Sequence, residues 1–273
     1  MTKLFCAVCA ICLALQLPLP LYAAEQPPWT FPVRADILEN RSRLLDIASR
    51  DNPLDADYVP HNLVPLKLRS VVSGPELRRE AADALTRMFE AADQAGYTLY
   101  VKSAYRSYQT QSTMYANRLD KYNKDDGVVA YPGTSDHQTG LGVDILNLAW
   151  TKQDGMRPEF GQTAEAQWMA SVCHEYGFIL RYMDGKQDIT GIIYEPWHFR
   201  YVGEEVAQYI MENNLTLEEF VEQARQAIVH YEQQGGDFYA LCRELTRLPD
   251  VIELTETDSE GDSELSFYKT NES

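Results

Sequence analysis

Apolar residues recur at helical spacing in several long stretches of the chain. The clearest stretch is residues 76–95, where Leu77 and Met88 fall on one face and Gly96 ends the run. Another helix is predicted at residues 163–176, with Gly177 as its C-cap. Further helices are predicted at residues 41–49, 109–122, 203–213 and 217–233. The chain is therefore rich in amphipathic helices.

Short apolar runs between these helices predict strands. The runs are residues 98–103, 142–146, 178–182 and 189–194. A turn at Asp184-Gly185 separates the last two, and residues 123–139 are predicted as a loop. Strands and helices alternate without a regular βαβ repeat. This pattern favours an α+β fold with a central, mainly antiparallel sheet flanked by helices over a doubly wound sheet.

The two ends of the chain differ in composition from the middle. Residues 1–24 carry one charge, then an apolar run and two small residues, which is the layout of a cleavable export signal. An uncleaved membrane anchor is the alternative. Residues 25–51 begin Pro-rich and are expected to form a linker or stalk. The main domain is then expected at residues 52–235, followed by an extension, 236–273, whose acidic tail is expected to be disordered.

The charge balance argues against one class of partner. The chain holds 41 acidic residues and 24 Lys and Arg, a formal net charge of −17. Nucleic acids and anionic membrane surfaces bind through clustered Lys and Arg, so neither is expected as a partner. No obligatory protein partner is expected either.

Cysteine usage indicates neither a metal motif nor a fixed disulfide. A CxxC-type metal site is absent from residues 25–273, where Cys173 and Cys242 are the only cysteines. Export would permit a bond between them. The sequence does not say whether their Cα atoms come close enough, so the pairing stays open.

A first candidate for metal chemistry is the stretch 135–144. It contains His137 and Asp144, together with Gly140 and Gly142, which allow a backbone to approach a ligand closely. Apolar residues flank Asp144 on a strand that is expected to be buried. A carboxylate is costly there unless it is paired or binds a metal. A surface His and a buried Asp–Arg pair are the alternatives.

A second candidate is the segment Glu195-Pro196-Trp197-His198. On a plain strand, residues three apart point to opposite faces, but Pro196 can bend the segment and bring Glu195 and His198 to one site. His198 would then complete a set of three zinc ligands, and Glu195 would be free to act as a base. A structural ion pair between Glu195 and an Arg such as Arg200 is the alternative. Spacing alone does not decide between them.

Arg106 follows the predicted strand at residues 98–103. A cation at a strand end can stabilise a developing oxyanion or hold a substrate carboxylate. An ordinary surface salt bridge is the alternative reading of this residue.

Three ordered motifs give the chain a family resemblance. They are SAYRSYQTQ (103–111), PGTSDHQTGLGVDI (132–145) and YEPWHFRYVG (194–203). Together they resemble the VanY-type D-alanyl-D-alanine carboxypeptidases, which are zinc peptidases of peptidoglycan grouped with D,D-dipeptidases and L,D-carboxypeptidases. The resemblance runs from about Asn52 to Asn213.

The resemblance implies a role for each candidate. His137, Asp144 and His198 match the ligands of one Zn²⁺ per chain, in a cleft of the fold. Glu195 matches the catalytic base, and Arg106 matches the arginine that polarises the scissile carbonyl and stabilises the oxyanion. The substrate-binding candidates are Gln111 and Ser135, which match pocket positions, with Ser103, Tyr105 and Trp197 as hydrogen-bonding or packing neighbours.

The resemblance also implies a function. The expected protein is a secreted or cell-envelope zinc carboxypeptidase, not a serine enzyme, that removes the terminal D-alanine from peptidoglycan stem peptides. An L,D-carboxypeptidase acting on tetrapeptide stems is an alternative that the sequence does not separate. A non-catalytic wall-binding protein is a further alternative, which the presence of all three ligands and Glu195 disfavours. A membrane tether would follow if residues 1–24 stay uncleaved.

Overall fold

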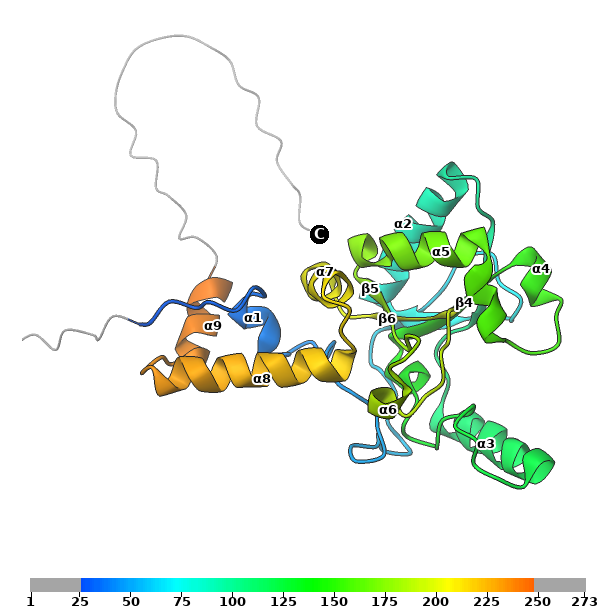
Figure 1. The fold of residues 1–273 in the computed structure, drawn as a ribbon, viewed down its shortest axis with the longest axis horizontal. Helices are drawn as coiled ribbons and strands as arrows, with labels where there is room; N and C mark the ends of the chain where they lie inside the picture. The colour runs from blue at the N-terminus through cyan, green and yellow to red at the C-terminus, as the bar shows by residue number, and fades with distance from the viewer. Residues whose placement is uncertain (1–25, 248–273) are drawn as a thin grey trace, which may run out of the picture.

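A four-stranded antiparallel sheet forms the centre of this computed structural model, which describes residues 26–247 (Figure 1). The strand order is β3-β4-β6-β5. The strands are β3 (Leu99–Ser103), β4 (Gly142–Asn147), β5 (Phe178–Leu180) and β6 (His198–Tyr201). A separate hairpin-like pair joins β1 (Leu63–Pro65) to β2 (Glu76–Arg78). The expected α+β class with a mainly antiparallel sheet is confirmed.

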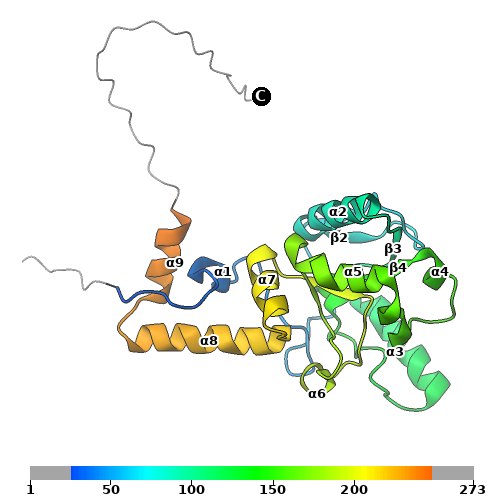
Figure 2. The same cartoon turned by 45° about the horizontal axis from the view of Figure 1, so that its top comes forward.

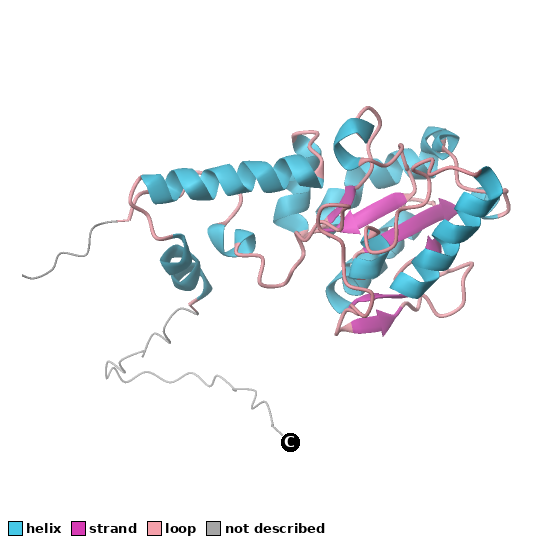
Figure 3. Ribbon diagram, turned by 90° about the horizontal axis from the view of Figure 1, so that it is seen from below, coloured by secondary structure: helices cyan, strands magenta, loops and turns pink. Residues whose placement is uncertain are grey.

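The helices divide between the two sides of the sheet. In Figure 1, α2 (Arg79–Gln94) and α5 (Ala164–Val172) lie on one side, and α3 (Tyr108–Tyr122) lies on the other. Figure 3 shows the strands of the sheet, in magenta, with helices around them. The remaining helices are α1 (Ala35–Leu38), α4 (Leu148–Thr151), α6 (Gln187–Thr190), α7 (Glu204–Glu212), α8 (Leu217–Gln233) and α9 (Phe238–Thr246). Short 3₁₀ helices are η1 (Asp136–Thr139), η2 (Pro158–Gln162) and η3 (Cys173–Tyr176).

The main hydrophobic core fills the space between the sheet and α2. Leu85 and Met88 of α2 pack in one cluster with Val143 and Ile145 of β4 and Phe199 of β6, and all five are buried. Successive side chains of a strand point to opposite faces. The residues next to Val143, Ile145 and Phe199 on β4 and β6 therefore point to the other face of the sheet. Asp144 and His198 are therefore presented on the face away from α2.

Residues 26–51 do not form the expected linker. Val33, Ala35 and Leu45 are buried in a second hydrophobic cluster, together with residues such as Phe220 of α8 and Phe238 of α9. Figures 1 and 2 show α1 beside α9, above the long helix α8. We call the unit formed by residues 26–51, α8 and α9 the helical extension. Residues 26–51, at the start of the described part of the chain, thus pack against α8 and α9 at its end.

Three local predictions need correction. The helix expected at residues 41–49 is absent because Asn40 and Arg43 adopt positive φ angles of 53° and 56°, which a right-handed helix does not accept. The helix expected from residue 76 begins at residue 79, because residues 76–78 pair with β1. The strand expected at residues 189–194 is also absent, since α6 occupies its start.

The other predicted helices and strands lie within a few residues of their expected positions, and η1 occupies the end of the loop predicted at residues 123–139. Strand β6, which was not predicted from the sequence, pairs with β4 and β5. Gly177 caps η3 in the left-handed region, as expected. Cys173 and Cys242 are free and lie in different hydrophobic clusters, so they form no disulfide.

Two expectations concern residues outside the described part of the chain. These are the export signal at residues 1–24 and the acidic tail beyond residue 247. Between residues 26 and 247, no helix combines the length and the apolar character that crossing a bilayer requires.

Gly140 offers a test of how tightly η1 must turn into β4. Its φ is +70°, and a Cβ there would lie 2.9 Å from Leu63 Cδ2 and 3.1 Å from Pro60 Cγ. Gly140→Ala should lower the free energy of unfolding by about 1–2 kcal/mol for the left-handed backbone, and by about 1–3 kcal/mol more for the crowding. Chemical denaturation measures both. Gly155→Ala is the matched control, because its φ is +77° but nothing lies within 4 Å of its Cβ position. Equal losses in the two variants would contradict the crowding.

Candidate active site

The pairing of β4 with β6 sets the floor of the site. Asp144 and His198 are directly opposite residues in this antiparallel pair. Directly opposite side chains lie on the same face, about 4.5–5.5 Å apart at Cβ. The hydrogen bond from the Ile145 N–H to the Trp197 carbonyl, 2.9 Å, extends the pairing beyond the strand. The register therefore brings an imidazole onto a carboxylate.

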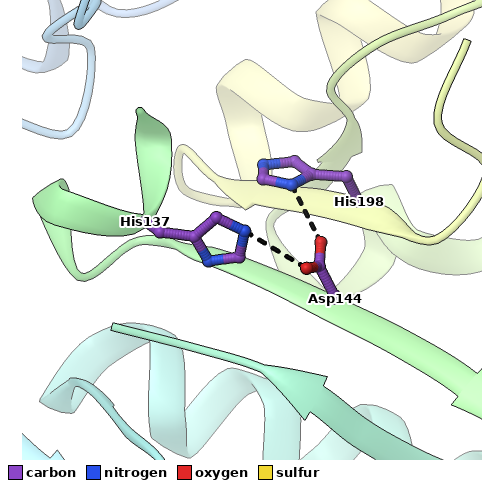
Figure 4. A group of neighbouring side chains, drawn as sticks. All are labelled: His137, Asp144 and His198. Carbon is purple, nitrogen blue, oxygen red and sulfur yellow. Dashed lines mark hydrogen bonds and ion pairs between the residues drawn. The ribbon is translucent and has the colours of Figure 1, made fainter. Parts of the chain in front are cut away.

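His137 joins this pair from η1, as Figure 4 shows. Its Nε2 lies 3.3 Å from Asp144 Oδ2, and His198 Nδ1 lies 3.0 Å from Asp144 Oδ1. One ligand atom from each of the three residues lies within 4.8 Å of the others, and all three residues are buried. The three predicted metal ligands are therefore brought together.

Backbone contacts fix the orientation of His137. Its Nδ1 lies 2.7 Å from the carbonyl oxygen of Ala104, which follows β3. Nδ1 is the donor in this contact, and Nε2 is then left free to face Asp144. Gly142 allows η1 to lie this close to β4, since a Cβ there would be 3.1 Å from Asp136 Cβ. Gly142, noted in the sequence, serves this close approach.

The donor set suits a zinc ion. Two imidazole nitrogens and one carboxylate converge in a buried place, which matches the three protein ligands of a catalytic zinc site with an open fourth position. No Lys or Arg within residues 26–247 makes an ion pair with Asp144. The alternative of a buried Asp144–Arg pair is thereby removed.

Glu195 reaches the site through a tight turn. The His198 N–H donates to the Glu195 carbonyl oxygen at 3.0 Å, which closes a four-residue turn with Pro196 at its second position. Glu195 Oε2 lies 3.8 Å from His198 Nδ1. The bend expected at Pro196 is present and brings both side chains to one place. Arg200 pairs with Asp136 instead of Glu195, so the alternative ion pair is also removed.

Arg106 is held at the edge of the cluster by its neighbours. Its Nη1 donates to Gln111 Oε1 at 2.8 Å, and its Nη2 donates to Ser103 Oγ at 3.3 Å. Its backbone N–H donates to the His137 carbonyl at 3.1 Å. Arg106 makes no salt bridge to a carboxylate in the described part of the chain, which leaves it available for a ligand. It is not the ordinary surface ion pair.

Burial and charge shift the titration of these groups. Burial raises the pKa of the Glu195 carboxyl to about 8, and the cations of His198 and Arg106 offset only part of this effect. Burial opposes the charge on His198, but Asp136 and Asp144 outweigh it and raise the pKa of this imidazole to about 9. Burial and then Arg106 lower the pKa of His137. The carboxylates thus favour positive charge at the His198 side of the cluster.

A cavity of about 230 Å³ opens onto this cluster. All three ligands, Glu195 and Arg106 line it, and so do the predicted pocket residues Gln111, Ser135 and Trp197. Ser103 and Tyr105 are not among its lining residues. Ser103 instead contacts Arg106, and the Tyr105 N–H donates to the Glu76 carbonyl at 2.8 Å.

Several cavity residues were not anticipated from the sequence. They are Met114 and Arg118 of α3, Val128, Val129 and Ala130 of the following loop, and Gly155, Met156, Tyr182 and Ile192. Most lie on loops or on an exposed helix face and have no chemical signature of their own. The regular spacing of Met114 and Arg118 along α3 is the signal that could have indicated a shared face.

A buried charge network behind His198 was also missed. The Asp136 carboxylate accepts hydrogen bonds from Arg200 Nη1 at 2.6 Å and from Arg181 Nε at 2.9 Å. All three side chains are at most 2% exposed. The sequence signal was available, since Arg181 and Arg200 stand in apolar segments where an unpaired cation would be costly.

Comparison with known proteins places this arrangement in a family. The sequence profile of VanY, described as D-alanyl-D-alanine carboxypeptidase, matches residues 74–204, which hold every site residue named above. VanXYC of Enterococcus gallinarum, named as a bifunctional D-Ala-D-Ala dipeptidase and carboxypeptidase, is 33% identical over 192 residues. Those residues are 67% of this chain and 96% of that protein. The chain belongs to the VanY family.

Other members of the family support this assignment. YodJ of Bacillus subtilis, provisionally named as a carboxypeptidase, is 39% identical over 198 residues, 70% of this chain and 71% of its own. Within the VanY family, the expectation of a metallocarboxypeptidase in place of a serine enzyme is confirmed.

Solved structures share the fold. The LdcB LD-carboxypeptidase superposes with a TM-score of 0.58 at 41% identity, covering 62% of this chain and 81% of that one. A variant of VanY, a D,D-pentapeptidase from a VanB-type vancomycin-resistance cassette, was solved in complex with Zn(II). It superposes with a TM-score of 0.54 at 31% identity, covering 65% and 98%. The assigned fold class is thus that of known zinc peptidases.

Proposed function

We propose that this VanY-family protein is a zinc-dependent carboxypeptidase that hydrolyses the terminal D-Ala-D-Ala bond of peptidoglycan stem peptides. The observation that carries the proposal is the convergence of His137, Asp144 and His198 beside a Glu195 carboxylate that binds none of the neighbouring arginines. The name of the enterococcal relative and the zinc in the VanY structure support it.

The residues divide the work of hydrolysis. Zinc held by His137, Asp144 and His198 would supply Lewis-acid chemistry, which makes water reactive at neutral pH. Glu195 takes a proton from the attacking water and later delivers a proton to the departing amine. Arg106 donates to the carbonyl oxygen, where negative charge develops. Its guanidinium is already held by Gln111 and Ser103, so little reorganisation is needed at that moment.

An L,D-carboxypeptidase acting on tetrapeptide stems is the second candidate. The LdcB LD-carboxypeptidase is 41% identical over the superposed region, against 31% for the VanY D,D-pentapeptidase. The two reactions share the same bond chemistry. They differ in the configuration of the residue that contributes the scissile carbonyl.

An extracytoplasmic location would suit the proposed substrate. Peptidoglycan stem peptides are assembled into the wall outside the membrane, so we propose that residues 1–24 direct export of this chain. Cleavage of that segment would release the protein, and retention would tether it.

Two substitutions separate metal binding from turnover. Glu195→Ala should keep one zinc per chain and abolish hydrolysis, because Glu195 moves protons and is not a ligand. His198→Ala should lose both, because a ligand is missing. Zinc content by elemental analysis, together with D-alanine release, measures the two effects. Activity retained in Glu195→Ala would contradict the assignment of the base, and full zinc content in His198→Ala would contradict the assignment of the ligand.

Arg106→Lys tests the role of the guanidinium. A lysine keeps the charge but loses the forked geometry, so kcat should fall by about 10²–10³ with zinc content unchanged. The control is Arg87→Lys on α2, whose exposed guanidinium pairs with Glu204 at 2.8 Å. An unchanged kcat in Arg106→Lys would remove Arg106 from the mechanism.

Product analysis decides between the two substrates. Protein lacking residues 1–24 is incubated with pentapeptide and tetrapeptide stems, with and without a chelator, and mass spectrometry identifies the products. We expect chelator-sensitive loss of D-alanine from the pentapeptide. Loss from the tetrapeptide alone would transfer the proposal to the L,D reaction. Bound zinc without cleavage of either stem would overturn the proposed substrate class.

A further inference from the structure

Asp136 is a buried carboxylate beside the candidate metal ligands, and the proposed mechanism does not use it. It precedes His137 in the chain, and its side chain is 0% exposed. Arg200 Nη1 holds Asp136 Oδ1 at 2.6 Å, and Arg181 Nε holds Asp136 Oδ2 at 2.9 Å. The guanidinium of Arg200, on β6, and that of Arg181, directly after β5, thus fix the plane of this carboxylate.

The fixed carboxylate faces the far nitrogen of His198. Asp136 Oδ2 lies 3.9 Å from His198 Nε2, while Nδ1 of the same ring faces Asp144. His198 Nε2 is buried and has no hydrogen-bond partner among residues 26–247. A separation of 3.9 Å is too long for a hydrogen bond, but a shift of about 1 Å would form one. Asp136 is therefore in a position to accept a hydrogen bond from Nε2 after a small shift.

Such a contact matters because a histidine ligand uses only one ring nitrogen. A partner on the other nitrogen fixes the tautomer and the ring orientation, and it raises the basicity of the ligand. His137 already has this arrangement, through Ala104. For His198, Asp136 is in the matching position.

The two arginines that bind Asp136 also donate hydrogen bonds to the helical extension. Arg181 donates from both terminal nitrogens to Glu218 of α8, at 2.8 and 2.5 Å. Arg200 Nη2 donates to the carbonyl oxygens of Leu44 and Asp46, at 3.0 and 2.8 Å. Leu44, Asp46 and Glu218 all lie outside residues 74–204, the span that the family profile matches. The candidate metal ligands are therefore connected to the helical extension through buried charged side chains.

The charge balance of this network depends on Glu218. Two guanidinium groups face two carboxylates, Asp136 and Glu218. Removing one partner of a buried ion pair leaves an uncompensated charge. Without the Glu218 carboxylate, a net positive charge would remain behind His198 and would oppose a cation on its other side.

We propose that Asp136 is a positioning residue for the metal ligand His198, and that Arg181 and Glu218 connect it to α8, so that the helical extension supports metal binding. This inference rests on the metal centre of the proposed function. It assigns to residues 26–51 and α8 a role at the active site, although none of them lines the cavity.

The proposal is tested by measuring the zinc affinity of the protein without residues 1–24. Competition with a chromophoric chelator gives this affinity. Asp136→Asn should weaken zinc binding by about 10–100-fold, as expected for loss of a partner on a histidine ligand. Asp136→Glu restores a carboxylate and should recover part of the loss. The visible spectrum of the Co(II)-substituted protein should change in Asp136→Asn, because it reports ligand geometry and not global stability.

A second substitution guards against misfolding of Asp136→Asn. Glu218→Gln lies on α8, with its side chain 24% exposed, and should weaken zinc binding by about 10-fold, the lower end of that range. The matched control is Glu222→Gln on the same helix, whose exposed carboxylate pairs with Arg225 at 2.7 Å. It should bind zinc like the unmodified protein. Melting temperatures measured without metal separate the loss of affinity from the loss of stability.

The outcomes distinguish this proposal from the proposed function. Zinc affinity and Co(II) spectra unchanged in folded Asp136→Asn would overturn the positioning role. If Asp136→Asn does not fold, Glu218→Gln decides: an affinity equal to that of Glu222→Gln would overturn the connection to α8. If the unmodified protein bound zinc but cut no stem peptide, the proposed substrate would fail and the positioning role would stand. An unmodified protein that binds no zinc would overturn both.

Discussion

The register between β4 and β6 is the constraint on which the rest of the site depends. A slip of one residue would turn every side chain of a strand to the other face. It would move Asp144 into the core beside α2 and expose Val143 and Ile145, which are fully buried. The hydrophobic effect therefore holds the two ligands opposite each other. The chemistry of the site uses a register that the core already stabilises.

The buried carboxylates of Asp136 and Asp144 are neutralised by different partners, and the partners determine whether each has a structural or a metal-binding role. Asp136 is bound by two arginines, which neutralise its charge without a metal. Asp144 faces two imidazoles, which can exchange a proton for a metal ion without leaving a charge unpaired. The same residue type thus serves as an anchor at one position and as a candidate ligand at the other.

The sequence predicted the elements that depend on local pattern and missed those that depend on distant partners. The amphipathic period of α2 and α8 and the bend at Pro196 follow from a few neighbouring residues, and all are present. Residues 189–194 have the β-branched and aromatic composition of a strand, but β6 pairs with both neighbours in the sheet instead. Residues 26–51 begin Pro-rich, yet they fold onto α8 and α9. Their apolar residues pack against distant helices, as the contact between Cys242 and Ala35 shows, which are 207 residues apart in the sequence. A local pattern does not contain that information.

The site combines a floor of residues on regular elements with walls of helix and loop residues, and this division bears on the choice between the two candidate reactions. The ligands stand on β4, β6 and η1, and Glu195 stands on a hydrogen-bonded turn. The walls come from α3, the loop after it, and the segments around Met156 and Ile192. A D,D and an L,D enzyme cut the same kind of bond, so they can share the floor. They differ in the configuration of one substrate residue, whose side chain must fit next to the floor. Only the wall residues contact that side chain, so only they can distinguish the two configurations. Selectivity in this chain is therefore expected to reside in apolar wall residues such as Met114, Val128 and Ile192, on segments that can change without disturbing the sheet.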